Sequence, residues 1–152
     1  MSRPGAARRN RALRKIRASH SLPPEIKLTT EALLDLLSAQ SDYQLAWPSA
    51  ARLARQTGKS RRTILWHIKT IEQLNIFHVR QFTPDEAVEY VYGKYRFAIN
   101  LDRCRHQAPN LFEVNTDHPL WNKSRTIPQE MEREWEAIVR HVNSARSGHR
   151  PA

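Results

Sequence analysis

Residues 47–75 read WPSAARLARQTGKSRRTILWHIKTIEQLN, and the rest of the architecture can be placed around them. Pro48 and Ser49 suit the start of a helix, because proline is tolerated in the first turn and a serine hydroxyl caps free amides. Gly58 readily adopts the left-handed conformation that ends a helix. Ser60 can cap the next helix, in which apolar residues recur at helical spacing: Ile64, Ile68, Ile71 and Leu74. The stretch therefore predicts two helices joined by a tight turn.

The chain before this stretch divides into a basic arm and a first helix. Residues 1–26 hold many arginines and no acidic residue before Glu25. Such a block repels itself, so we expect a disordered arm that could become helical against phosphates. A helix capped at Thr29 or Thr30 follows, and residues 44–47 favour a short extended segment.

The chain after this stretch favours two strands and a last helix. Residues 76–82 and 90–101 are rich in β-branched and aromatic residues, so they predict a two-stranded hairpin. Residues 103–127 lack periodicity and predict an irregular connection. The last segment, 128–147, has the pattern of an amphipathic helix, and its apolar face carries Met131, Trp135, Ile138 and Val142.

This order of elements is the winged helix-turn-helix arrangement. We expect an α+β fold, mainly α, with a two-stranded wing, a basic N-terminal arm and a C-terminal helix. The expected segments are the arm at 1–26, the winged domain at 27–102, the irregular connection at 103–127 and the C-terminal amphipathic helix at 128–147.

The charge of the chain points to a polyanionic partner. The 152 residues carry a formal net charge of +10, which favours nucleic acid or an anionic membrane surface. No run approaches the ~18 consecutive apolar residues of a membrane span, and no apolar core follows the first basic residues as in a secretory signal. We therefore expect nucleic acid rather than a membrane. Cys104, the single cysteine, fits a reducing cytoplasm.

The helix that begins at Ser60 is expected to read DNA. In helix-turn-helix proteins the second helix enters the major groove, with its first residues at the base edges. No acidic residue occurs between Asp42 and Glu72. A guanidinium can bind the O6 and N7 edge of guanine with two bonds. The expected contacts are Lys59, Ser60, Arg61, Arg62, Thr63, Leu65, Trp66 and Lys69. For Trp66 the alternative is that it folds back onto the first helix or the hairpin.

Further contacts to DNA are expected from the wing and the arm. Arg80, Lys94 and Arg96 of the wing could reach phosphates, although Asp85 and Glu86 near the expected tip would be repelled. The alternative for the wing is an ordinary solvated hairpin. In the arm, the expected phosphate contacts are Arg8, Arg9, Arg11, Arg14 and Lys15.

Short motifs occur in a fixed order along the chain: Trp47-Pro48-Ser49, Leu53-Ala54, Thr57-Gly58, Ser60-Arg61-Arg62-Thr63, Ile71-Glu72-Gln73-Leu74 and Tyr95-Arg96-Phe97. Together they resemble the winged helix-turn-helix domains of bacterial plasmid and phage replication proteins. The resemblance covers about residues 28–101. It implies sequence-specific duplex binding, with DNA-facing positions at Ser60, Arg61, Arg62 and Lys69. Two residues depart from the pattern: Asn75 stands where glycine is usual, and His67 where a small residue is usual.

These features lead to one expected function and several alternatives. We expect a protein that binds double-stranded DNA in replication initiation or control on a mobile element, in the bacterial cytoplasm with the nucleoid or a plasmid. The alternatives are a transcriptional regulator and an RNA-binding or general nucleic-acid-binding protein that uses its basic arm. The stripe of Met131, Trp135, Ile138 and Val142 could join a second copy or a partner protein, or pack against the domain.

No pattern in the sequence favours an enzyme. We find no nucleophile elbow, phosphate-binding loop or paired metal carboxylates. The histidines do not pair at the spacing of metal ligands, and the tyrosines resemble those of relaxases only by residue type. We therefore expect no catalytic residues, no metal and no cofactor.

Overall fold

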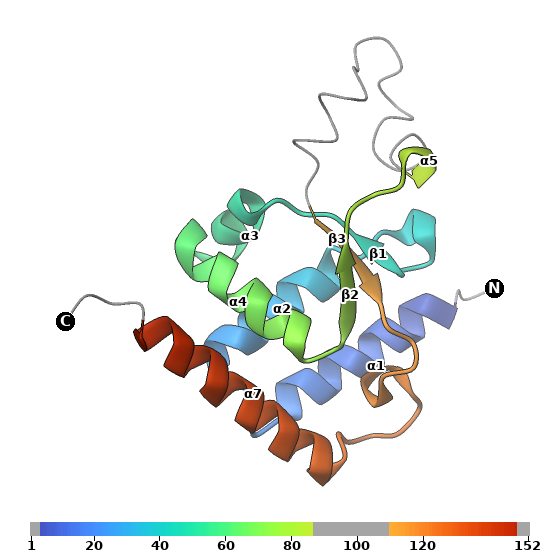
Figure 1. Cartoon of the computed structure of the whole chain (residues 1–152). Coiled ribbons are helices and arrows are strands. Elements are labelled where there is room, and N and C mark those ends of the chain that lie inside the picture. The colour runs from blue at the N-terminus through green and yellow to red at the C-terminus, as the bar shows by residue number, and fades with distance from the viewer. Residues whose placement is uncertain (1–3, 87–109, 149–152) are drawn as a thin grey trace.

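The computed structural model describes residues 4–86 and 110–148 of the chain. Figure 1 shows a mostly helical body with a small sheet. In chain order the elements are α1 (Pro4–Ala18), α2 (Pro24–Asp35), η1 (Ala39–Ser41), β1 (Leu45–Ala46), α3 (Ala50–Thr57), α4 (Arg61–Gln73), β2 (Phe77–Arg80), α5 (Pro84–Glu86), β3 (Leu111–Val114), η3 (Pro119–Trp121) and α7 (Gln129–Gly148). No helix in these ranges is both long and apolar enough to cross a lipid bilayer.

Helices α3 and α4 form the predicted pair joined by a tight turn. The Ser49 hydroxyl accepts a hydrogen bond from the Arg52 amide at 3.0 Å, and the Ser60 hydroxyl accepts one from the Thr63 amide at 3.1 Å. Gly58 ends α3 in the left-handed conformation, with φ of 73°. The apolar stripe of α4 is buried as predicted: Ile64, Ile68, Ile71 and Leu74.

The sheet completes a winged helix-turn-helix. Its strand order is β1-β3-β2, and β3 pairs antiparallel with both neighbours. The fold class is therefore the predicted one, α+β and mainly helical. The expected extended segment at 44–47 contains β1, and the expected strand at 76–82 contains β2.

The strand that pairs with β2 corrects the prediction for the wing. β3 lies within 103–127, which we expected to be irregular, and so does η3. As the central strand, β3 has buried residues on both faces, among them Leu111 and Phe112. It therefore lacks the alternation that identifies a half-buried strand. The expected strand at 90–101 lies outside the described residues.

The N-terminal arm also differs from the prediction, because most of it is helix α1. Ala12, Leu13 and Ile16 are buried in the hydrophobic core. These apolar residues lie among so many arginines that the composition of the N-terminal segment, taken alone, predicted a disordered arm. The burial of these three side chains offsets the entropic cost of ordering the helix.

Helix α2 begins earlier than expected, so the predicted boundary between residues 26 and 27 falls inside it. Its first residue is Pro24, in a position where the missing amide costs nothing. Thr29 and Thr30 are interior residues rather than caps. Their hydroxyls donate to the carbonyl oxygens of Glu25 at 3.3 Å and Ile26 at 2.7 Å.

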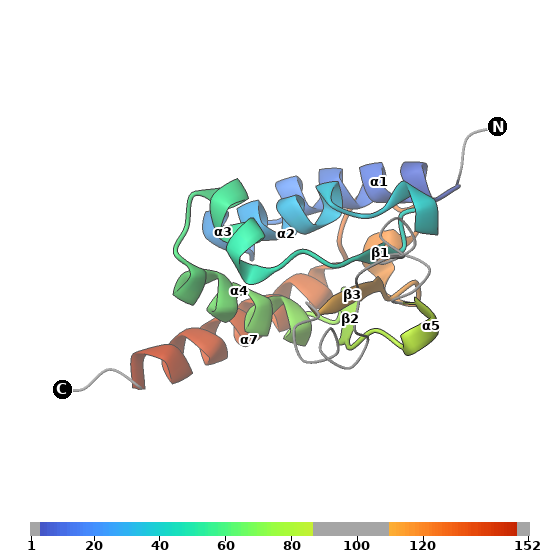
Figure 2. The ribbon, with the colours of Figure 1, turned by 90° about the horizontal axis from the view of Figure 1, so that it is seen from above.

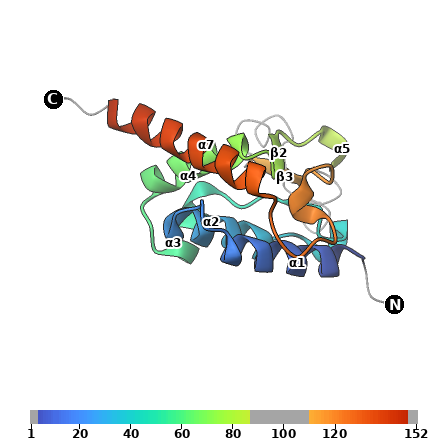
Figure 3. The same cartoon turned by 90° about the horizontal axis from the view of Figure 1, so that it is seen from below.

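Helices α1, α2 and α4 follow one another across the body, with α2 between the other two (Figure 2). Helix α7 packs along α4 (Figure 3). Trp135 and Val142 of its apolar stripe are buried in the chain's own fold, and Met131 and Ile138 are half-buried. The stripe is therefore occupied, and a second copy or partner protein bound through it is unsupported.

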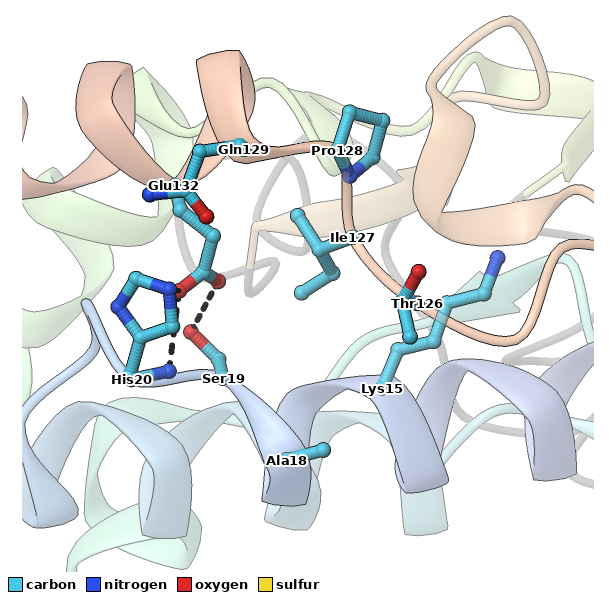
Figure 4. Close-up of a pocket in the computed structure, with 9 residues that line it drawn as sticks. All are labelled: Lys15, Ala18, Ser19, His20, Thr126, Ile127, Pro128, Gln129 and Glu132. Atoms are coloured by element: carbon cyan, nitrogen blue, oxygen red, sulfur yellow. Dashed lines mark hydrogen bonds and ion pairs between the residues drawn. The ribbon is translucent and has the colours of Figure 1, made fainter.

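A buried carboxylate joins the end of α1 to the start of α7. Figure 4 shows Glu132 in direct contact with Ser19 and His20, and all three line a pocket of about 420 Å³. Its oxygens accept from the Ser19 hydroxyl at 2.6 Å and from the His20 amide at 3.0 Å. The amide of Ser21 also donates to it at 3.0 Å. These bonds satisfy the buried charge within the chain.

Candidate nucleic-acid interface

The exposed face of α4 carries the side chains that the sequence placed there. Arg61, Arg62 and Lys69 are exposed, and so is Leu65, with 46% of its surface accessible. On the opposite face Ile64 is fully buried. The core therefore fixes which side of the helix can enter a groove.

The start of α4 is capped within the chain. The Ser60 hydroxyl accepts from the Thr63 amide and donates to the Thr63 hydroxyl at 3.0 Å. As at every helix start, further backbone amides lack an intrahelical partner and carry partial positive charge. Arg61 and Arg62 thus project from a helix end that already attracts anions. Lys59, immediately before the cap, is half-buried.

Trp66 lies at the edge of this face, beside a small cavity that residues at the start of α2, among them Glu25 and Ile26, also line. It is half-buried, and it lines this cavity together with Val142 and Arg146 of α7. The ammonium of Lys69 lies 4.9 Å from the centre of its ring. This cation–π contact holds the Lys69 side chain beside the other exposed side chains of α4.

His67 fixes the position of α4 against α2. It is buried, as its place beside the stripe predicted, and its Nδ1 lies 2.7 Å from the Thr29 hydroxyl. Its Nε2 lies 3.6 Å from a Glu25 carboxylate oxygen. Burial lowers the pKa of His67, and Glu25 opposes this shift. The histidine therefore fills, with a hydrogen bond, a position where the resemblance led us to expect a small residue.

Helix α3 contributes two arginines that the sequence analysis did not include in the site. Arg52 and Arg55 are exposed on α3, which packs directly against α4. In helix-turn-helix proteins the first helix of the motif crosses the DNA backbone, where such side chains meet phosphates. The sequence already indicated these two arginines as candidate contacts, because both lie in the stretch that lacks acidic residues.

At the base of the wing the structure corrects the role of Arg80. Its guanidinium makes two 2.7 Å bonds to the Glu86 carboxylate and one of 3.3 Å to Glu113. These bonds lower the pKa of Glu86 to about 2 and raise that of Arg80. The charge expected to meet a phosphate is thus neutralised within the chain. Lys94 and Arg96 lie outside the described residues.

In the former arm the structure corrects the role of Lys15. Its side chain is buried, and its ammonium donates to the carbonyl oxygens of Pro119, Leu120 and Asn122. It therefore anchors α1 and cannot contact a phosphate. The remaining expected contacts of the arm lie on α1, across α2 from α4: Arg8, Arg9, Arg11 and Arg14. The structure does not bring them to the surface of α4.

No metal-binding cluster accompanies this surface within residues 4–86 and 110–148. No group of three or more histidine, cysteine, aspartate or glutamate side chains there could hold an ion. The exposed chemistry of α3 and α4 is that of charged donors, which bind phosphates and base edges.

Comparison with known proteins identifies the same part of the chain. Residues 33–76 match the family described as a helix-turn-helix domain. The match runs from within α2 through α3 and α4 to the residue before β2. No curated protein and no solved structure matches the chain. A helix-turn-helix domain suggests DNA binding, with DNA as the partner.

Proposed function

We propose that this chain binds duplex DNA in a sequence-specific manner and serves replication initiation or control on a plasmid, phage or other mobile element. It acts by binding and carries out no chemical step. The observation that carries the proposal is the first turn of α4, where Arg61 and Arg62 are exposed beside a capped helix start. The choice of replication rests on the motif resemblance described above.

The surroundings of α4 suit a rigid reading helix. Ile64 and Ile68 lock one face into the core, and His67 is bonded to α2. A helix held in this way loses little entropy on binding, so its contacts contribute more fully to affinity. A bidentate arginine–guanine contact is worth roughly 1–3 kcal/mol of discrimination between bases.

The test is selection of bound sequences from a random duplex library at physiological salt. We expect one enriched sequence, and we expect Arg61→Ala and Arg62→Ala each to relax the preference at one base position. Arg133→Ala, which removes an exposed arginine from α7, is the matched control and should leave the preference unchanged. An unaltered preference in both α4 variants would refute the assignment of the reading helix.

The arrangement of selected sites addresses the biological role. Repeated sites in the same orientation support an initiator, whereas a single inverted repeat supports a dimeric regulator, because symmetric sites reflect protein two-fold symmetry. If no sequence is enriched and an RNA duplex competes as well as DNA, sequence-specific DNA binding is wrong.

A further inference from the structure

Helix α1 displays arginines on an ordered surface. It contains no acidic residue, and Ala12 and Ile16 are fully buried beneath it. The buried ammonium of Lys15 ties the last turn of this helix to the segment around η3. The arginines of α1 are therefore held in place by the fold before any ligand arrives, which lowers the entropic cost of binding one.

Most of these arginines lack an acidic partner. Within residues 4–86 and 110–148, Arg17 alone of the α1 arginines pairs with a carboxylate, that of Glu31. Arg8, Arg9 and Arg11 are half-buried, and some of their nitrogens are shielded from solvent without a hydrogen-bond acceptor among the described residues: Nε and Nη2 of Arg8, Nε of Arg9 and Nε of Arg11. Arg14 is exposed. These shielded nitrogens are out of reach of a ligand, but the uncompensated positive charge of the cluster attracts an anion, which would meet the exposed parts of the side chains.

The spacing of these side chains suits a continuous polyanion. Arg8 and Arg11 are three residues apart on α1, and so are Arg11 and Arg14. Residues at this spacing are neighbours on a helix surface. A guanidinium binds a phosphate with two parallel bonds. Neighbouring arginines can therefore contact the backbone of one strand.

This surface is separate from the reading helix. Helix α2 lies between α1 and α4 (Figure 2). On α2, Glu31 is paired with Arg17 of α1, and Asp35 adds an exposed negative charge between the two basic surfaces. A straight duplex on α4 would have to bend around α2 to reach Arg14, and bending a short duplex by 40–90° costs roughly 1–6 kcal/mol.

We propose that the arginines of α1 bind the phosphate backbone of a second DNA segment, so that one protein molecule bridges two duplexes. The inference rests on the proposed function, since α4 must hold the first duplex. The second contact is independent of sequence, because it involves phosphates and no base edges. A protein that joins two segments can pair binding sites or close a loop between them.

The experiment measures how much of a second duplex is captured by protein that is already bound to a first. A duplex with the selected sequence is immobilised, the protein is bound, and a short fluorescent duplex without that sequence is added. The variant R11Q/R14Q removes two charges from α1, and R133Q/R140Q removes two exposed charges from α7 as the matched control. Circular dichroism confirms that each variant is folded.

We expect R11Q/R14Q to bind the immobilised duplex normally but to capture roughly 10-fold less of the second duplex, because two phosphate contacts are lost. The salt dependence of capture should also decrease by about 1.8 in log–log slope, at ~0.9 per contact. The control should capture as much as the unmodified chain.

Two results would overturn the inference. One is equal capture by R11Q/R14Q and the control. The other is capture of an RNA duplex or an acidic polypeptide by the unmodified chain, with no capture of the second DNA duplex. Failure of the proposed function gives a different result, because R61Q/R62Q would then bind the immobilised duplex as well as the unmodified chain does.

Discussion

The ammonium group of Lys15 lies where α1 meets the segment around η3. Its hydrogen bonds to Pro119, Leu120 and Asn122 have lengths of 2.9–3.1 Å. Burial lowers the pKa of Lys15, and the neighbouring positive charge of Arg11 lowers it further. The bonded carbonyl oxygens compensate for part of the desolvation of this charge. Lys15 therefore links segments that are far apart in the sequence.

Replacing Lys15 with methionine should destabilise the protein. The substitution preserves the apolar stem but leaves several carbonyl oxygens without their donor, at a cost of about 3 kcal/mol. Urea denaturation measures the change. The exposed Arg14→Met on the same helix is the control and should stay within about 0.5 kcal/mol of the unmodified chain. Equal stability of the two variants would contradict the anchoring role of Lys15.

His118 makes stability depend on pH. Its ring is stacked on Trp135 with centroids 5.7 Å apart, and its Nδ1 accepts from the Leu120 amide at 3.1 Å. Burial lowers the pKa of His118 to about 4, against an opposing bond to the Leu74 backbone and with a smaller contribution from Lys15. The unfolded chain, with a histidine pKa near ~6.5, therefore binds more protons than the folded chain between these values.

The stability that His118 contributes is present above pH 6.5 and decreases as the pH falls toward 4. From pH 7 to pH 5 we expect a loss of about 2 kcal/mol, measured by urea denaturation at each pH. His118→Asn keeps a capping side chain for η3 but does not titrate, so its stability should decrease less over this range. The lowered pKa of His67 acts in the same direction and remains in the variant. An unchanged decrease in His118→Asn would rule out His118 as its source.

At the scale of elements, α4, the proposed reading helix, is followed by a residue in an uncommon conformation. Asn75, which follows Leu74, the C-cap of α4, has φ of 61°. Asparagine tolerates the left-handed region better than other residues with a Cβ atom. Asparagine in place of the expected glycine therefore still allows the turn from α4 into β2.

Substitutions at Asn75 should separate backbone conformation from side-chain contacts. Asn75→Ala should be less stable than Asn75→Gly by about 1 kcal/mol, because alanine carries the Cβ penalty that glycine avoids. Thermal unfolding of the two variants measures the difference. The same pair of substitutions at exposed Glu134, inside α7, should give the opposite order, since glycine destabilises a helix interior. Equal stabilities at position 75 would show that the turn imposes no such requirement.

At the scale of the whole molecule, α1 is part of the folded domain. Leu13 and Ile16 are buried in the core, and each such side chain contributes roughly 1.5–3 kcal/mol. Gly5 allows close approach, since an added Cβ would lie 1.9 Å from the carbonyl oxygen of Asp42.

Deletion of residues 1–20 should therefore remove most of the stability of the domain, not only its affinity for DNA. Gly5→Ala should lower the urea midpoint as well, because backbone cannot move aside easily, whereas Ala7→Ser on the exposed side of α1 should not. A truncated chain with an unchanged midpoint would mean that the N-terminal segment is an arm after all.

The helix-turn-helix could be predicted from the sequence because the features that define it depend on residues close together in the chain. Ser49, Ser60 and Gly58 define helix ends by bonding or bending within a few residues, and the stripe of α4 has the helical period. The outward positions of Arg61 and Arg62 followed from that stripe. The family match at residues 33–76 covers this same part of the chain.

Contacts between distant residues were decided by the tertiary structure. The pairing of β2 with β3, the anchoring of Lys15 and the ion pairs of Arg80 each join segments separated by long stretches of sequence. The periodicity of one segment carries no information about its partner in another, and the same arginine or lysine suits solvent, phosphate or a buried carbonyl. By itself, therefore, the sequence determined helix α4 and which of its faces points outward. Packing determined which basic residues remain exposed and unpaired, because a buried or ion-paired side chain still adds to the net charge of the composition but is not available to a ligand.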